Sequence, residues 1–330
     1  MRRILTIDGG GIKGVFPAAF LAEIEDWLGQ PIADYFDLIA GTSTGGIIAM
    51  GLGLGLTAGE LLQHYKEHGA KIFRSRRVTS NLRRILRAKY SLQPLRAAVE
   101  HAFGDRRMGH SRKRLLVPSL DLVSERVYIY KTAHHPTLNR DYEIPAVEVA
   151  LATVAAPTYF PIHLSDEGAY VDGSLWARNP LALAVVEAIG ALDWPREEIR
   201  VLSLGCTSNT LDIAWDKRVS FGASYWGARI ADVFMKAQSS SAIATAHTLV
   251  GSHNVYRISP DTTARDFTLD GVGRIPELEA LGRDEAALAV DDLADVFFSQ
   301  PAELFIPCHS LDDDSRPPLP LPASPGTAAA

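Results

Sequence analysis

The stretch YFDLIAGTSTGGIIAMG (residues 35–51) contains an apolar run, a tight glycine-flanked turn and a second apolar run. The first run, residues 35–41, predicts a buried β-strand, and the residues from Ile47 onward predict a helix. A strand that leads through a short turn into a helix is the repeating unit of α/β proteins with parallel strands. The sequence therefore predicts an α/β fold with a mostly parallel central sheet and helices on both faces.

Ser43 lies in the middle of this turn and matches the pattern G-x-S-x-G, with Gly41 and Gly45 on either side. Small flanking residues are what a nucleophile elbow needs, since the turn is tight and the serine backbone is strained. The N-terminus of the following helix also favours negative charge on the serine oxygen. In a simpler interpretation Thr42, Ser43 and Thr44 only cap the helix. The strand before the turn and the helix after it favour catalytic chemistry.

A glycine-rich segment, DGGGIKG (residues 8–14), occupies a similar place between the apolar strand RILTID and the helical pattern VFPAAFLAEIEDWLG. Gly9, Gly11 and Gly14 satisfy G-x-G-x-x-G, the turn of dinucleotide-binding proteins. That turn requires an acidic residue at the end of the next strand, about twenty residues on. Here the next strand ends in the serine turn, so the motif alone is weak. Consecutive backbone N–H groups before a helix still predict an anion site.

A nucleophilic serine needs a base, which is normally a histidine oriented by a carboxylate. No histidine after Ser43 lies in a recognisable strand-end loop, although His247 and His253 stay open as alternatives. Asp172 in YVDGS stands at the end of a buried strand, and Gly173 leaves space beside it. In a dry site a carboxylate becomes basic enough to take the serine proton directly. An Asp-Gly pair is also a common turn, so this motif alone does not show whether Asp172 is a catalytic base.

The rest of the chain predicts further strands and helices. RLLVPSLDLV and RVYIYKTA predict a hairpin, VEVALATVAAPTYF a helix up to Pro157, NPLALAVVEAIGAL another helix and IRVLSLGC a buried strand. Residues 221–250 and 276–298 predict helices, with the strand NVYRISP between them. The tail, residues 310–330, is rich in proline, alanine and acidic residues and predicts disorder. Since no repeat or linker is evident, we expect a single domain over residues 1–309.

Composition narrows the classes of function. The formal charge of −6 argues against binding of nucleic acid polymers, and a hydrophobic content of 47% supports a sizeable core. Two distant cysteines, Cys206 and Cys308, fit free thiols in a reducing compartment. The first apolar stretch of the sequence is only strand-length, so we expect no signal peptide, and no apolar run is long enough to span a bilayer. We therefore expect a cytoplasmic protein that meets membranes only at their surface, and no metal, because no Cys/His cluster would bind one.

Three motifs in this order, DGGGIKG, GTSTG and DGS, resemble the patatin-like phospholipase family. That family is built from a glycine-rich oxyanion loop, a G-x-S-x-G serine and a D-G-[GA] aspartate. The resemblance covers residues 3–205, including AAPTYFP before the aspartate strand, and leaves a mixed helical portion over residues 206–309. The motif residues that flank the reactive groups are Asp8, Gly9, Gly14, Gly41, Gly45 and Gly173.

The resemblance implies Ser43 as the nucleophile and Asp172 as its base, in a dyad that needs no histidine. It also implies that the amides of Gly10 and Gly11 form the oxyanion hole, with Lys13 adding positive charge. Ser174 departs from the Gly or Ala of the family, but it is still small. The implied function is hydrolysis of acyl esters of membrane phospholipids without a cofactor. Two rivals are a nucleotide-binding module at the glycine segment and a catalytically silent lipid-binding protein.

Within the family, the stretches IDGGGIKGVFPAAFLAEIE and FDLIAGTSTGGIIAMGLGLGL look most like bacterial members. One branch of these acts in anti-phage signalling, where a cyclic dinucleotide switches on the degradation of membrane phospholipids. The resemblance thus implies a cyclic-dinucleotide activator and action at the inner face of the membrane. The oligomeric state stays open, with a homo-oligomer as one alternative. It draws attention to the acid-free stretch KIFRSRRVTSNLRRILRAKYS, a predicted phosphate- or headgroup-binding surface or else a solvated basic face. Its candidate arginines are Arg74, Arg76, Arg77, Arg83, Arg84 and Arg87.

Overall fold

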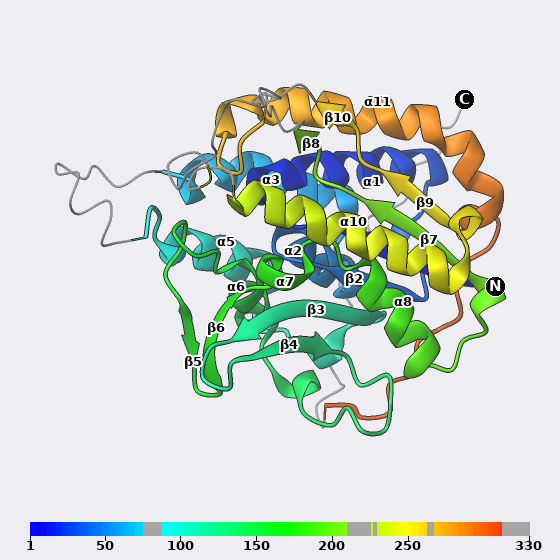
Figure 1. Cartoon of the computed structure of the whole chain (residues 1–330), viewed down its shortest axis with the longest axis horizontal. Coiled ribbons are helices and arrows are strands. Elements are labelled where there is room, and N and C mark those ends of the chain that lie inside the picture. The colour runs from blue at the N-terminus through cyan, green and yellow to red at the C-terminus, as the bar shows by residue number, and fades with distance from the viewer. Residues whose placement is uncertain (75–87, 210–225, 227–229, 263–266, 312–330) are drawn as a thin grey trace, which may run out of the picture.

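The computed structural model describes residues 1–74, 88–209, 226, 230–262 and 267–311. In this part of the chain, one large sheet forms the centre of the molecule (Figure 1), with the strand order β5-β6-β3-β2-β1-β7-β9 and with β4 paired to β3. The strands are β1 (Arg2–Ile7), β2 (Leu38–Gly41), β3 (Arg114–Asp121), β4 (Arg126–Lys131), β5 (His163–Ser165), β6 (Gly168–Asp172), β7 (Ile199–Leu204), β8 (Ser208–Asn209), β9 (Val255–Ile258) and β10 (Asp261–Thr262).

The middle of the sheet is parallel and one end of it is antiparallel. β3, β2, β1, β7 and β9 pair in parallel, whereas β4 and β6 run antiparallel to β3, and β5 antiparallel to β6. The predicted α/β class with a mostly parallel sheet is confirmed.

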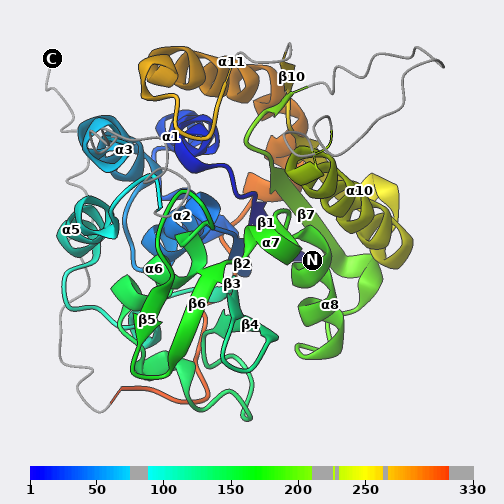
Figure 2. The ribbon, with the colours of Figure 1, turned by 60° about the vertical axis from the view of Figure 1, so that its left-hand side comes forward.

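Helices cover both faces of this sheet, as Figure 2 shows, with α8 and α10 on one side and α1, α2, α3 and α5 on the other. The helices are α1 (Val15–Leu28), α2 (Thr44–Gly53), α3 (Ala58–Ile72), α5 (Leu92–Phe103), α6 (Ala146–Val154), α7 (Ser174–Ala177), α8 (Leu181–Gly190), α10 (Ile230–Val250) and α11 (Ile275–Leu293). α11 packs along α1, at the top of Figure 1.

The side chains of β1 alternate between the two cores that these helices close. Leu5 and Ile7 join the larger cluster with α1, α2 and α3, whereas Ile4 joins the cluster below α8 and α10. A strand that is buried on both faces has no solvent-facing positions to fill with polar residues. This explains why the central strands appear in the sequence as continuous apolar runs.

Most predicted elements are found, with differences of a few residues in their bounds. The helix predicted to continue to Pro157 ends at Val154. Past this point the carbonyl of Ala155 accepts a hydrogen bond from Asp172 N at 3.1 Å, and the residue before a proline disfavours helical geometry. Helices α3 and α5 were not predicted. Of the predicted helix over residues 221–250, positions 221–225 and 227–229 lie outside the described residues, as do residues 312–330 of the tail.

None of the helices in the described ranges combines the length and the hydropathy that crossing a bilayer would require.

Candidate active site

Ser43 occupies the turn between β2 and α2 with a positive backbone φ of 55° and a ψ of −122°. A non-glycine residue in this region is strained, which is the hallmark of a nucleophile elbow. The turn closes only because its flanking residues are glycines. A Cβ on Gly41 would lie 2.0 Å from the carbonyl oxygen of Gly45, and one on Gly45 would lie 2.3 Å from the carbonyl oxygen of Ile7.

The Ser43 hydroxyl donates a hydrogen bond of 2.7 Å to Oδ2 of Asp172. The other carboxylate oxygen, Oδ1, accepts the backbone N–H of Ser174 at 2.7 Å, which fixes the orientation of the carboxylate. Burial raises the pKa of Asp172 to about 6, against the opposing effect of these hydrogen bonds. The aspartate is thus ionised at neutral pH, yet more basic than an exposed carboxylate.

β3 brings these two side chains together. β4 occupies one edge of β3, so β2 and β6 share the opposite edge. Ala40, the last residue of β2 paired with β3, lies opposite Leu116. β6 runs the other way and ends with Asp172 opposite Ser119. The carboxyl ends of the two strands therefore meet, and the turn with Ser43 faces the end of β6.

Thr153 of α6 supports the elbow and was missed in the sequence. Its hydroxyl accepts the backbone N–H of Ser43 at 2.9 Å and donates to the carbonyl of Pro118 at 2.6 Å. No histidine of the described residues is hydrogen-bonded to the Ser43 hydroxyl, and neither His247 nor His253 lines the cavity above it. The geometry therefore offers a dyad of Ser43 and Asp172.

The glycine segment lies beside Ser43 and exposes two N–H groups. Gly9 N donates to the carbonyl of Arg178 at 2.9 Å, and Ile12 N donates to that of Leu269, also at 2.9 Å. Between them, the N–H groups of Gly10 and Gly11 have no protein partner within the described ranges, and both residues line the cavity. Gly11 has φ +59°, and a Cβ there would lie 2.2 Å from the carbonyl oxygen of Leu269.

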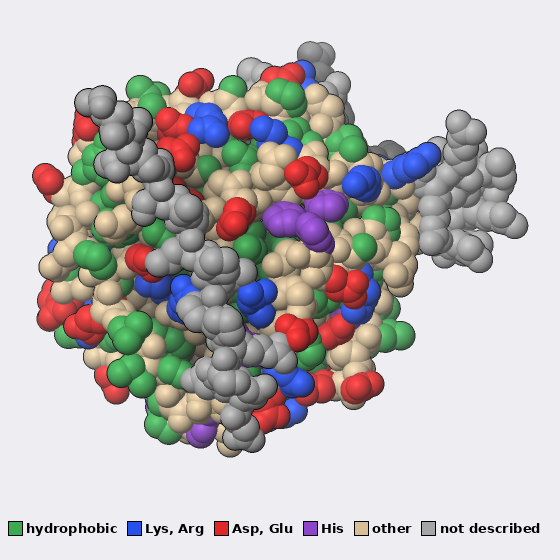
Figure 3. Space-filling model, turned by 180° about the vertical axis from the view of Figure 1, so that it is seen from behind, with side chains coloured by type: hydrophobic (Ala, Val, Ile, Leu, Met, Phe, Trp, Pro, Cys, Tyr) green, Lys and Arg blue, Asp and Glu red, His purple; other side chains and the backbone are tan. Residues whose placement is uncertain are grey.

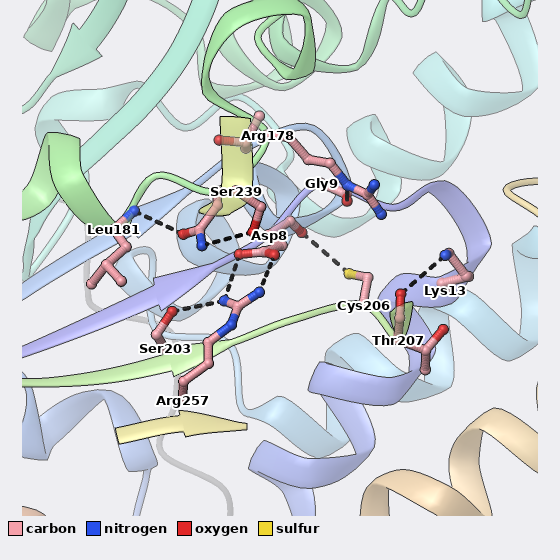
Figure 4. Close-up of polar contacts among 12 residues, drawn as sticks. Asp8, Gly9, Lys13, Arg178, Leu181, Ser203, Cys206, Thr207, Ser239 and Arg257 are labelled. Carbon is pink, nitrogen blue, oxygen red and sulfur yellow. Dashed lines mark hydrogen bonds and ion pairs between the residues drawn. The ribbon is translucent and has the colours of Figure 1, made fainter. Parts of the chain in front are cut away.

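A polar network holds the segment from below (Figure 4). Arg257 of β9 binds the carboxylate of Asp8 through both terminal nitrogens, and the thiol of Cys206 donates to the carbonyl of Asp8 at 3.2 Å. Burial raises the pKa of this thiol to about 12, so it stays protonated. Arg257 and Cys206 come from segments that the motifs do not include, and no local signal in the sequence pointed to them.

Lys13 lies beneath the loop rather than in the cavity. It is 4% exposed, its Nζ donates to the carbonyl of Thr207 at 3.3 Å, and it is absent from the cavity lining. Burial lowers the pKa of Lys13 to about 8, and the positive charge of Arg178 is the second-largest cause of this shift. Its predicted contribution of positive charge would therefore act through the loop and not by contact with a ligand.

A cavity of about 600 Å³ opens above Ser43 and extends between α3 and α5. Its walls are mostly apolar; they include Leu61, Ile72, Phe73, Leu95, Val99 and Phe160. His64 and His68 also line it, and their rings stack with centroids 5.7 Å apart, next to His101 of α5. Seen from behind the view of Figure 1, a group of histidine side chains reaches the surface of the molecule (Figure 3). The space suits a long apolar chain whose ester reaches Ser43.

The basic stretch is only partly described. Arg74 follows α3 and is exposed. The other predicted anion-binding arginines, Arg76, Arg77, Arg83, Arg84 and Arg87, lie outside the described residues. Lys89 forms an ion pair with Asp270 instead.

Several known proteins are similar to this chain. A family model described as patatin-like phospholipase matches residues 5–185. A "cGAMP-activated phospholipase" of Pseudomonas aeruginosa is 33% identical over 298 residues, which cover 88% of this chain and 89% of the relative. A protein of the same name from Escherichia coli is 35% identical over 62% of this chain and 61% of its own length. The solved structure of VipD from Legionella pneumophila aligns with 88% of this chain and 67% of its own, with 13% identity and a TM-score of 0.43.

Proposed function

The chain belongs to the patatin-like phospholipase family, and from this premise we propose that Ser43 and Asp172 are its catalytic dyad. The observation that carries the proposal is the 2.7 Å hydrogen bond from the Ser43 hydroxyl to a buried carboxylate, next to the free amides of the glycine segment. The substrate class is the acyl esters of membrane phospholipids.

In the first half of the reaction, Ser43 Oγ attacks the ester carbonyl while Asp172 takes the hydroxyl proton. The carbonyl π electrons move to oxygen, and the amides of Gly10 and Gly11 stabilise this oxyanion. When the tetrahedral intermediate collapses, the lysolipid alkoxide leaves with the proton from Asp172, and the acyl group stays on Ser43. Water then attacks the acyl-enzyme with Asp172 as base, and the fatty acid is released.

Labelling with a fluorophosphonate tests this reaction, because the reagent modifies only an activated serine. With saturating cGAMP present, the activator that the relatives' name states, we expect the label on Ser43 in the wild-type protein and none in Ser43→Ala. We also expect release of fatty acid from phospholipid vesicles by the wild-type protein only. Unlabelled wild-type protein would instead support a silent lipid-binding or nucleotide-binding module. Mass spectrometry of the products identifies the acyl position that is cleaved.

We further propose that a cyclic dinucleotide activates this enzyme and that it acts peripherally at the membrane. The support is the name of the relatives, cGAMP-activated phospholipase, and the coverage of 88% of this chain by one of them. A ligand shifts an equilibrium only if it binds the active form more tightly, at about 1.4 kcal/mol for each tenfold change. Lipid hydrolysis with and without cyclic di- and trinucleotides tests it. Full activity without any nucleotide would contradict it.

A further inference from the structure

Arg178 places a cation in the wall of the catalytic cavity. It follows α7 and lines the cavity together with Gly9, Gly10 and Ser43. Among the described residues that form this wall, it is the only lysine or arginine. Lys13, the cation that the sequence motif suggested, lies behind the loop. Positive charge therefore reaches the substrate side of the loop from Arg178.

Two hydrogen bonds fix Arg178 to the glycine segment. Its carbonyl accepts the N–H of Gly9 at 2.9 Å, and its Nε donates to the carbonyl of Gly9 at 3.1 Å. Figure 4 shows the guanidinium lying against Gly9, one residue before the proposed oxyanion donors. The charged group thus stays at a fixed place beside the reacting ester.

The remaining donors of this guanidinium are available for a ligand. Over the described ranges, Nε is the only side-chain nitrogen of Arg178 in a hydrogen bond, and no carboxylate forms an ion pair with the residue. Arg257 differs in this respect, because Asp8 binds both of its terminal nitrogens. An arginine has five N–H donors, arranged to bind two oxygens of one anion. In the described part of the chain, the terminal nitrogens of Arg178 therefore stay available to bind a phosphate, whereas those of Arg257 are bound to Asp8.

The electrostatics of the site agree with this placement. Burial raises the pKa of Asp172, and the charge of Arg178 is among the effects that oppose the rise. Burial is the largest cause of the lowered pKa of Lys13, and the positive charge of Arg178 is the second-largest. The guanidinium is therefore close enough to influence both groups, one on each side of the glycine segment.

We propose that Arg178 is the binding subsite for the phosphodiester of the phospholipid whose acyl ester Ser43 attacks. The proposal rests on the proposed function. In a glycerophospholipid the phosphate is attached to the glycerol, only a few bonds from the ester carbonyls, so a bound anion must lie near the oxyanion donors. Arginine is suited to phosphate oxygens, which it can bind through two parallel hydrogen bonds. A cyclic dinucleotide carries the same phosphodiester chemistry, so the experiment must separate the two sources.

The test compares the wild-type protein, Arg178→Gln and Arg178→Lys on two substrates in the same detergent micelles, with saturating cGAMP. One substrate is phosphatidylcholine, and the other is a neutral p-nitrophenyl ester of a fatty acid. Lys236→Gln is the matched control, since Lys236 lies on α10 just beyond the cavity-lining residue Met235. The measured quantity is kcat/KM for phosphatidylcholine divided by kcat/KM for the neutral ester.

We expect Arg178→Gln to lower this ratio at least about tenfold, mainly through KM, because charge-assisted hydrogen bonds are strong. Arg178→Lys should restore part of it, and Lys236→Gln should leave it within about twofold, as for a surface charge. Loss of the hydrogen bond to Gly9 should lower kcat/KM for both substrates alike. Dividing by kcat/KM for the neutral ester therefore removes this effect from the ratio. An unchanged ratio in Arg178→Gln would overturn the proposal and leave Arg178 as a positioning residue.

A calorimetric arm separates the two sources of phosphate. We expect cGAMP to bind Arg178→Gln and the wild-type protein with the same Kd. A Kd at least tenfold weaker in the variant would assign the guanidinium to the nucleotide and overturn the lipid subsite. If the wild-type protein hydrolyses neither substrate, the proposed function itself fails, which is a different result from an unchanged ratio.

Discussion

Arg257 donates two hydrogen bonds to the carboxylate of Asp8, from Nη1 to Oδ1 at 2.9 Å and from Nη2 to Oδ2 at 2.5 Å. The same guanidinium also donates to the hydroxyl of Ser203 at 2.8 Å. The pair joins β9 to the end of β1, directly before the glycine segment, and both side chains are largely buried. The position of the proposed oxyanion donors thus depends on a residue 249 positions away in the sequence.

Arg257→Gln should destabilise the fold by about 3–5 kcal/mol and slow ester hydrolysis, because it leaves the carboxylate of Asp8 buried without its cation. Urea unfolding and the rate on a p-nitrophenyl ester measure the two effects. Arg283→Gln is the control, since its pair with Glu23 is partly exposed and is expected to contribute no more than about 1 kcal/mol. Equal small effects of both substitutions would contradict a supporting role for the buried pair.

Ser43→Ala and Asp172→Asn should each abolish hydrolysis while the protein stays folded, and the double variant should be no slower than either single one. Members of a catalytic unit are not additive, because removing one makes the other useless. Steady-state rates and circular dichroism of the three variants test this. Substantial activity in folded Asp172→Asn would refute the dyad, and a loss in His247→Ala or His253→Ala would indicate a triad instead.

The activity should fall as the pH drops through about 6. Burial raises the pKa of Asp172 to about 6, and only the ionised carboxylate can accept the serine proton. We expect kcat/KM for a soluble neutral ester to decline tenfold per pH unit well below this value and to be level above it. A profile that stays flat down to pH 4.5 would argue against Asp172 as the base.

Asp172→Asn should also make the protein more stable at alkaline pH. The folded-state pKa of about 6 lies above the ordinary value of 3.8, so the folded protein holds this proton more tightly than the unfolded chain. The stability of the wild-type protein is then lost as the pH rises through about 6, by about 3 kcal/mol in total. Asparagine carries no charge to bury, so the advantage of the variant should grow from pH 4 to pH 7 and then level off.

Urea unfolding of both proteins at several pH values measures this difference. Asp232→Asn, at an exposed carboxylate of the cavity rim, is the matched control and should show no such trend. A variant that is less stable than the wild-type protein at pH 8 would contradict a buried charge at Asp172.

The sequence allowed the prediction of those parts of the site that follow from local pattern. The elbow at Ser43 and the strand that ends at Asp172 depend on neighbours within a few residues, and both elements are found where they were expected. Arg257 and Thr153 could not be predicted, because their partners are brought together only by the order of the strands. Arg178 follows Asp172 by six residues, so the sequence shows a cation near the dyad. That this residue lines the cavity could not be predicted from the sequence.

β1 lies in the middle of the sheet, with β2 on one side and β7 on the other. During synthesis β2 is available early, but the second edge of β1 stays open until residue 204 has left the ribosome. Parallel pairings over such a separation also form slowly. A nascent chain therefore carries Ser43 without a completed sheet around it until residue 204 has been made. The late strand β7 thus ties completion of the central sheet beside the site to synthesis of the chain as far as residue 204.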